Sequence, residues 1–487
     1  MSKSERRYFK LQIANGGGME SQRFARIFDT ILRQVSFNEA AIIESEKLNT
    51  GNWAIHKTRL YEHILNSLQQ FHKRQGPERK IINLLDQAEI LYQKGLYSQA
   101  ETLLQKAEKT AREYDKNLLL ARVIEWKRRV AYFTLSKDEK PTGKASKKIV
   151  SQIGTTSFLH QLNTDIYAIF SDQGRVARSE SARSEMKQLL HKAHNEVAEN
   201  SLNEPQLMKL NRALQIAYSV LGEAEQSYTH SNRNRILFES SSHPEALNKD
   251  DYLSAYNQMV IACHILEDTS RARQVIAELR SLPDSNPAFD SIHYQSRIFD
   301  YSAFHELEGY ILDQNKEKLE GSLPQLERDL EAKSSLLNPV NLQSKRYRIA
   351  LGYFILGKYR QGLKRLALLR SNQHKTFRKD IKDSIDLLYL MAHFALDNWE
   401  VLEREVPVVK NYLKLHKRLY QPQQKLLQIL EDSFSSNNAD WQITKHQIAA
   451  LRHSESEAPK GVRTICYFSI SDWLQTFSNQ QVLVHSS

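Results

Sequence analysis

The sequence predicts an all-α fold, and three observations support this. Glycine and proline together number 27 of the 487 residues, under half of the roughly 12% that average composition would give. Chains with so few turn formers have little room for the closely spaced turns of sheet folds, whereas Leu, Ala, Gln, Glu, Lys and Arg favour helices. Apolar residues also recur at spacings of three and four, and small and large side chains repeat in a helix-hairpin pattern. We therefore expect a superhelix of stacked helix hairpins.

The first 76 residues are expected to form a helical N-terminal module. After Gly16-Gly17-Gly18, one apolar stripe consists of Phe24, Ile27, Phe28, Ile31, Leu32 and Val35. A second periodic stretch starts at Trp53 and reaches Phe71, before Gly76-Pro77 interrupts the chain. Two or three amphipathic helices explain this pattern.

Residues 77–135 carry the clearest hairpin signal, followed by a further helix. The small residues Ala88, Ala100 and Ala107 alternate with bulky leucines on either side of a turn at Gly95-Leu96-Tyr97. Small residues at facing positions allow two antiparallel helices to pack at about 8–10 Å. This arrangement resembles the tetratricopeptide repeat, whose family pattern implies stacked hairpins with a concave binding surface. The run of the first 135 residues also resembles helical-repeat proteins of Bacteroidota-type bacteria.

The hairpin phase recurs downstream, where Tyr359 takes the place of Tyr97 and weaker copies centre on Thr269, Lys316 and Trp399. The separations between successive positions from Thr269 to Lys316, Tyr359 and Trp399 are 47, 43 and 40 residues. These separations are longer than the usual ~34 residues of the repeat. We expect divergent repeats over 159–487, ending in a capping helix after Gly461, with a short strand at 462–468 as the alternative. Residues 136–158, which contain Pro141, Gly143 and several lysines, are expected to be a linker or long loop.

The charge of the chain is unevenly distributed. The formal net charge is +11 overall, and the count by segment is +11 for residues 1–150, −6 for 151–350 and +6 for the remainder. Basic ends could attract nucleic acid or an acidic protein, although charge on helices is mostly a solvated face. Two distant cysteines, Cys263 and Cys466, and no signal-peptide or membrane-spanning pattern point to a cytoplasmic protein.

No residues suggest catalysis, a cofactor or a metal ion. Gly143-Lys144 lacks the earlier glycine and the preceding strand of a phosphate loop. His191 and His194 share a helix face but have no third ligand nearby. His305-Glu306 lacks the second histidine of a zinc-protease helix. We expect a protein that is not an enzyme.

The resemblance to the tetratricopeptide repeat implies a set of groove-lining residues. Transferred position by position, these are Asn257, His264, Tyr301, Glu308, Tyr347, Phe354, Met391 and Phe394. Several of them, Phe354 and Phe394 in particular, could equally belong to the core between helices. The Lys and Asn pair with which some family members bind a peptide carboxylate is missing. The leading expectation is a non-catalytic scaffold or adaptor that binds a protein or peptide of unknown identity.

The alternative is a DNA-binding regulator. The helix after Asn52 carries Lys57 and Arg59 near its start and could be the second helix of a helix-turn-helix. Lys127, Arg128 and Arg129 form a denser basic cluster. Ordinary helix packing explains the apolar residues around them, so nucleic-acid binding is the less favoured expectation.

Overall fold

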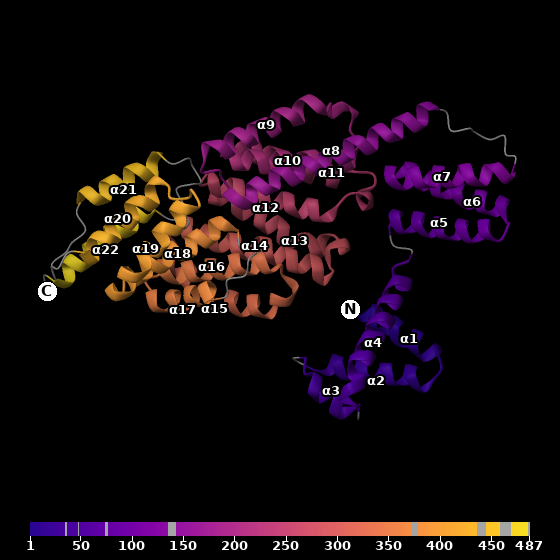
Figure 1. Ribbon diagram of the computed structural model, residues 1–487, viewed down its shortest axis with the longest axis horizontal. Coiled ribbons are helices and arrows are strands. Elements are labelled where there is room, and N and C mark those ends of the chain that lie inside the picture. The colour runs from indigo at the N-terminus through magenta and orange to yellow at the C-terminus, as the bar shows by residue number, and fades with distance from the viewer. Residues whose placement is uncertain are drawn as a thin grey trace. The chain divides into compact units, whose positions relative to one another are not determined.

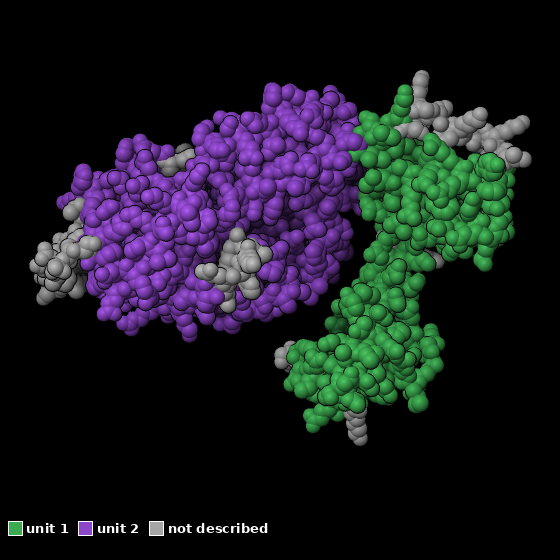
Figure 2. All heavy atoms as spheres, viewed as in Figure 1, with its two compact units in different colours: residues 1–153 green, residues 154–487 purple. Residues whose placement is uncertain are grey.

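The computed structural model describes residues 1–34, 37–46, 48–73, 76–134, 143–371, 378–435, 445–457 and 469–485. These ranges contain twenty-two α-helices, four short 3-10 helices and no strand (Figure 1). The expected all-α fold, with consecutive helices packed against each other, is confirmed. The chain divides into two compact units, residues 1–153 and 154–487 (Figure 2).

The first unit contains two separate apolar clusters. Four helices surround the first: α1 Lys3–Asn15, α2 Met19–Arg33, α3 Glu39–Ser45 and α4 Thr50–Phe71. Three helices surround the second: α5 Pro77–Gln93, α6 Tyr97–Glu113 and α7 Asn117–Thr134. Ala88, Ala100 and Ala107 are fully buried between α5 and α6, as the small-residue pattern predicts.

The second unit is an array of helix hairpins. After α8 Gly143–Gln173 and α9 Glu180–Glu196, five hairpins follow: α10 Glu204–Leu221 with α11 Ala224–Ser240, α12 Lys249–Ile265 with α13 Thr269–Ser285, α14 Ile292–Leu312 with α15 Lys316–Ala332, α16 Pro339–Ile355 with α17 Tyr359–Ser371, and α18 Lys379–Phe394 with α19 Trp399–Leu415. The predicted hairpin positions Thr269, Lys316, Tyr359 and Trp399 are the first residues of α13, α15, α17 and α19. Tyr97 likewise begins α6.

One turn geometry joins the helices of each hairpin. The residue two positions before the second helix has a positive φ in all six, including α5–α6: Gly95, Gly222, Glu267, Gln314, Gly357 and Asp397. The next residue donates its N–H to the carbonyl five residues back, at 2.9–3.0 Å. This is the Schellman arrangement, which satisfies carbonyls that the helix end leaves unpaired. The turn therefore fixes where each second helix begins.

The α10–α11 hairpin was not identified from the sequence because α11 buries polar residues. The Oγ of Ser227 donates to the Gln215 carbonyl at 2.7 Å, and Asn234 Nδ2 donates to the Met208 carbonyl at 2.9 Å. Polar side chains are tolerated in a helix interface when they are hydrogen-bonded there. The interface therefore lacks the apolar period on which the prediction depended.

The first helices of the hairpins form the inner side of the array. Packing contacts join α10 to α12, α12 to α14, α14 to α16 and α16 to α18, whereas no two successive second helices make a comparable contact within the described part of the chain. Each hairpin is therefore a wedge, and the stack curves around its first helices. We call α10, α12, α14, α16 and α18 the inner helices.

Three helices complete the chain: α20 Gln421–Ser435, α21 Lys445–Glu457 and α22 Ile470–His485. Glu455 accepts hydrogen bonds from the N–H groups of Ile470 and Ser471, at 2.9 and 3.2 Å, which fixes the start of α22. The ring of Trp473 then lies 5.2 Å from that of Phe354. The alternative strand at 462–468 lies outside the described residues.

The expected linker at 136–158 is partly wrong. Residues 136–142 lie outside the described residues, but α8 begins at Gly143 and continues without interruption to Gln173. A lysine-rich sequence is poor evidence for a loop, because lysine is itself a good helix former. Among the described residues, no helix combines the length and the apolar character needed to cross a bilayer.

Candidate functional site

The eight predicted groove residues divide into three groups. Asn257, His264 and Glu308 come together in one polar cluster on α12 and α14. Tyr301 is only partly buried, and its hydroxyl is 3.4 Å from Arg297 Nη1. The other four, Tyr347, Phe354, Met391 and Phe394, are buried in the largest apolar core cluster.

The expectation that these last four side chains face a ligand is therefore wrong. Phe354 and Met391 are fully buried, and Tyr347 and Phe394 are 2% exposed. The repeat pattern assumes that the concave side of each inner helix is open. Here α22 covers part of it, since the rings of Trp473 and Phe477 contact Phe394 at 6.3 and 5.6 Å.

Glu308 is the centre of the polar cluster. Its carboxylate receives two N–H groups from Arg175, at 3.0 and 3.1 Å, and an ion pair from Arg348 on α16. The Nδ1 atoms of His264 and His305 lie 3.1 and 3.2 Å from Glu308 Oε2. A fully buried carboxylate requires this many partners, because an unpaired buried charge costs several kcal/mol.

The protonation of the cluster follows from its geometry. Burial alone would raise the pKa of Glu308, but Arg175 and Arg348 hold that pKa well below its ordinary value. Burial lowers the pKa of His305 to about 3, against the opposing attraction of Glu308. At neutral pH the cluster therefore consists of an ionised carboxylate, two guanidinium groups and a neutral His305.

The neutral His305 determines the orientation of the Asn257 amide. Nδ1 of His305 must carry the proton in order to donate to the carboxylate, which leaves Nε2 as an acceptor. The Asn257 amide group is 2.9 Å from Nε2, and only its NH2 end can donate there. We therefore assign Nδ2 of Asn257, rather than its oxygen, to this contact.

Two further buried ion pairs involve side chains of the inner helices α14, α16 and α18. Lys345 Nζ lies 3.0 Å from Asp300, with both side chains nearly inaccessible. Burial lowers the pKa of Lys345 to about 8, although Asp300 opposes that shift. Arg418 pairs with the buried Asp383 at 2.5 Å. Burial raises the pKa of Asp383 to about 6, against the opposing charges of Arg418 and Arg178.

Sequence reasoning missed Arg175, Arg348 and Lys345. Their signal was available in part for Arg348, because the second half of its helix, from Tyr347 to Ile355, is otherwise apolar. A charge at such a position predicts a buried partner. Nothing in the sequence indicated Arg175, since it follows Gly174 in the connection between α8 and α9.

That connection crosses the inner helices, and we call residues 172–178 the inner segment. Its main chain is bonded to α10, because Ala177 N–H donates to the Val220 carbonyl at 2.7 Å and Ser219 Oγ donates to the Arg175 carbonyl at 3.1 Å. Its side chains reach other helices: Arg175 pairs with Glu308 on α14, and Asp172 pairs with Lys379 on α18. The segment thus spans three inner helices in seven residues.

The closest approach in the inner segment is at Gly174. Its φ is +87°, and a Cβ atom there would lie 2.5 Å from Asp380 Oδ2. Only glycine meets both requirements, because a side chain would collide with the carboxylate and strain the backbone. Val176 and Ala177 beside it are buried.

One group of residues has the composition of a metal site. The possible ligand atoms of His264, His305 and Glu308 lie within 4.8 Å of one another. The carboxylate is already bound to two guanidinium groups, which repel a cation and cannot lose their protons. The Nδ1 atoms that face Glu308 could become ligands only if their protons moved to Nε2, which would end their hydrogen bonds to the carboxylate. The arrangement therefore suits an internal ion cluster better than a metal centre.

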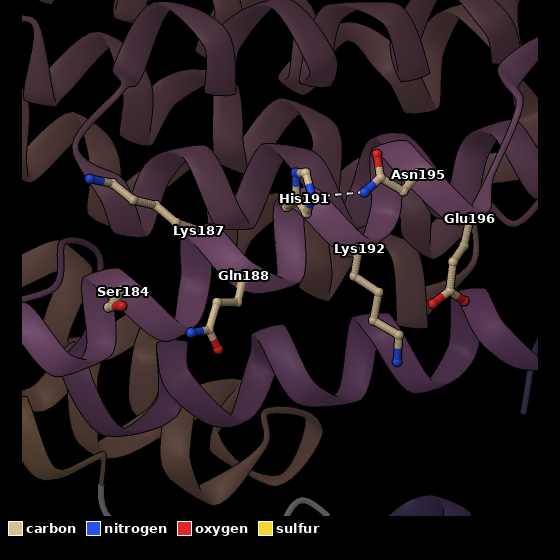
Figure 3. Close-up of a pocket in the computed structure, with 7 residues that line it drawn as sticks. All are labelled: Ser184, Lys187, Gln188, His191, Lys192, Asn195 and Glu196. Atoms are coloured by element: carbon tan, nitrogen blue, oxygen red, sulfur yellow. Dashed lines mark hydrogen bonds between the residues drawn. The ribbon is translucent and has the colours of Figure 1, made fainter.

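His191 and His194 occupy the outer side of α9, beside an open depression of about 500 Å³. Figure 3 shows that its seven lining residues follow one another along this single helix, and that Asn195 is hydrogen-bonded to His191 at 2.8 Å. His194 Nε2 instead lies 3.5 Å from the Tyr218 hydroxyl. Side chains of one helix diverge, so this surface presents no converging ligand set.

A larger groove of about 730 Å³ lies between the hairpin turns of α14–α17 and the helices α21 and α22. Tyr359 and Trp473 line it, and Trp473 Nε1 donates to the Tyr359 hydroxyl at 3.3 Å. Two of its charged groups, Arg452 and Asp472, are paired with each other at 3.0 Å. These contacts hold α22 in place.

Lys57, Arg59, Lys127 and Arg129, which were predicted as nucleic-acid contacts, form ion pairs within the first unit. Lys57 pairs with Glu39 at 3.2 Å, and Arg59 with Glu20 at 2.7 Å. On α7, Lys127 pairs with Glu108 at 2.6 Å and Arg129 pairs with Glu125. Arg128 is exposed. Pairing with a carboxylate reduces the positive potential on which phosphate binding depends.

Comparison with protein-family models, with curated proteins and with solved structures gave no match. The function is therefore argued from the inner helices and the segment that they bind.

Proposed function

We propose that this chain is a non-catalytic helical-repeat scaffold of tetratricopeptide-like design, which binds an extended segment of a partner protein. The observation that carries the proposal is the inner segment. The inner helices bind a stretch of non-helical chain in three ways: the Val220 carbonyl of α10 accepts the Ala177 N–H, Ser219 Oγ of α10 donates to the Arg175 carbonyl, and the Glu308 carboxylate of α14 accepts from Arg175. A groove that binds its own extended segment has the chemistry needed to bind that of another protein.

The polar cluster supports a binding role better than a catalytic one. A general acid or base works best when its pKa is near the operating pH. The pKa of Glu308 is held well below its ordinary range by two arginines, and burial lowers the pKa of His305 to about 3. Neither group would exchange a proton readily at neutral pH.

The buried, unpaired Cys263 supports a reducing environment, and we propose the cytoplasm. Burial raises the pKa of its thiol to about 12, so the thiol would stay protonated and unreactive. Cys466 lies outside the described residues.

The proposal is tested by affinity capture from an extract of the cells in which the chain is native, at low and high salt. Asn257 and Tyr301 are the two predicted groove residues that remain partly exposed, so the double variant Asn257→Ala/Tyr301→Ala should lose a salt-resistant protein partner. Glu317→Ala, an exposed change on α15, is the matched control and should retain it. Equal capture by both variants would place the binding surface outside the groove, and absence of any protein partner would refute the scaffold.

The same experiment separates the scaffold from the DNA-binding alternative. The short α3 followed by α4 has the order of a helix-turn-helix, but the Lys57 and Arg59 ion pairs argue against it. If bound nucleic acid disappears above moderate salt and depends on Lys57 and Arg59, the regulator becomes the better proposal.

A further inference from the structure

The inner segment carries two arginines three residues apart, Arg175 and Arg178, and Arg175 is bound to an acidic group of the inner helices. Arg175 forms two hydrogen bonds to Glu308. Arg178 is among the charges that act on Asp380 and Asp383 of α18. The bonded carboxylate is thus that of Glu308 on α14, and Arg178 adds positive charge near the carboxylates of α18.

The contact at Glu308 is specific for arginine. A bidentate pair of the guanidinium and carboxylate fixes both the distance and the plane of the side chain, which a lysine ammonium cannot do. The carboxylate is fully buried beneath the segment, and a desolvated charged hydrogen bond discriminates more strongly than an exposed one. The site thus recognises one residue type within an extended chain.

The inner segment is held differently from the helices around it. Its first two residues end α8, and the Gly174 N–H still bonds to the Phe170 carbonyl at 2.8 Å. From Arg175 onward the main chain is non-helical, and its bonds to α10 are the Ala177 to Val220 pair and the Ser219 to Arg175 pair. Segments with few main-chain bonds open locally at lower free energy than packed helices. We therefore expect the segment to open at lower free energy than the hairpins, provided that an arginine of the partner takes the place of Arg175 at Glu308.

We propose that the groove formed by α10, α14 and α18 is a receptor for extended peptides that place an arginine against Glu308, and that the inner segment is its internal occupant, which a partner must displace. This inference rests on the proposed function and names both the chemistry of the partner and the regulation of the site. The apparent affinity for a partner is then the intrinsic affinity of the open groove multiplied by the fraction of molecules in which the groove is open.

The variant Gly174→Ala changes the inner segment and leaves the residues of the groove unsubstituted. The added Cβ would lie 2.5 Å from Asp380 Oδ2 at a φ of +87°, so the variant weakens the seating of the segment without changing the groove wall. Gly154→Ala on α8 is the matched control, since a Cβ there meets nothing within 4 Å. Both proteins are used at full length.

The probe is a fluorescent peptide with the sequence of residues 171–179, SDQGRVARS, followed by fluorescence anisotropy. Gly174→Ala should bind it at least tenfold more tightly than the wild type and Gly154→Ala do. A peptide with alanine at both arginine positions should not bind. A folded Gly174→Ala protein with no gain in affinity, or equal binding of the alanine peptide, would overturn the inference.

Hydrogen exchange on the wild-type chain gives a test that does not depend on the variant folding. The Ala177 amide should exchange faster than amides in the middle of α18, and excess peptide should accelerate its exchange further. If the Ala177 amide were as protected from exchange as the amides of α18, and if peptide did not change its exchange, the inner segment would be a fixed part of the fold. A partner captured from extract would in that case still support the scaffold, with its binding surface elsewhere.

Discussion

At the scale of single residues, Glu308 organises the inner helices because its carboxylate is shared by four side chains from different parts of the chain. Arg175 comes from the inner segment, His264 from α12, His305 from α14 itself and Arg348 from α16. A carboxylate without these partners would not remain ionised at such a depth. The cluster is thus satisfied only when four segments are in place together.

Glu308→Ala should therefore destabilise the second unit strongly. The change leaves two buried guanidinium groups without their carboxylate, which costs about 3–5 kcal/mol. Glu306→Ala on the same helix is the control, because Glu306 pairs with Arg280 at a half-exposed position and such pairs contribute about 0–1 kcal/mol. The free energy of unfolding in urea measures both, and equal losses would contradict the central role of Glu308.

His305 makes stability depend on pH. Folding lowers its pKa to about 3 from about 6.5 in the unfolded chain, so below pH 6.5 the unfolded state binds a proton that the folded state does not. The corresponding stability is full above pH 6.5 and declines as the pH falls toward 3. Between pH 7 and pH 5 the loss from this residue is about 2 kcal/mol.

Between pH 7 and pH 5, the loss in the free energy of unfolding should be about 2 kcal/mol smaller for His305→Gln than for the wild type. The pKa of Glu308 is well below its ordinary value, so the titration of Glu308 falls below this window. His453→Gln, at an exposed position on α21, should keep the wild-type slope. Urea titrations at the two pH values decide the matter, and parallel curves for wild type and His305→Gln would show that His305 does not stay neutral.

At the scale of helices, the hairpin turn has the same geometry in all six hairpins, although the residue at its positive-φ position differs. Three of the six turns place a residue other than glycine at a positive φ: Glu267, Gln314 and Asp397. The left-handed conformation costs such residues about 1–2 kcal/mol. The turn persists because the Schellman hydrogen bonds and the packing of both helices over-determine it.

Glu267→Gly should stabilise the α12–α13 hairpin by about 0.5–1 kcal/mol, since relief of the left-handed strain exceeds the entropy that glycine adds to the unfolded chain. Gly357→Ala, at a φ of +73° with nothing within 4 Å of the added Cβ, should destabilise by a similar amount. Thermal midpoints of the two variants report both effects. A loss of stability in Glu267→Gly would mean that the glutamate side chain has a contact worth more than the strain.

At the scale of the whole molecule, the two units should unfold separately. Residues 1–153 and 154–487 each have their own apolar clusters, and cooperative unfolding follows such cores. Calorimetry of the full chain should therefore resolve two transitions.

Ala107→Glu should lower only one of these transitions. Ala107 is fully buried between α5 and α6, and a charge there costs several kcal/mol. Leu390→Ala, in the core of the second unit, should lower only the other, by about 2–5 kcal/mol. Lys109→Ala, an exposed change on α6, should shift neither by more than about 0.5 kcal/mol. One transition that responds equally to all the buried changes would refute independent units.

The sequence by itself determined the all-α class and the starting residues of α6, α13, α15, α17 and α19. Helix pairs are local, so the alternation of small and large residues around one turn reports them directly. The same local pattern missed α10–α11, where Ser227 and Asn234 replace the apolar stripe with hydrogen bonds. It also misassigned the first part of α8, residues 143–158, as a linker.

Only the tertiary structure decided which of the predicted groove residues meet. Asn257, His264 and Glu308 were selected on repeat offsets and do come together, but their partners Arg175 and Arg348 lie 133 residues before and 40 residues after Glu308 in the chain. Phe354 became core because α22, from the end of the chain, packs against it through Trp473. Burial and charge pairing depend on which segment occupies the groove. A local sequence pattern carries no information about contacts between residues that are tens to hundreds of positions apart.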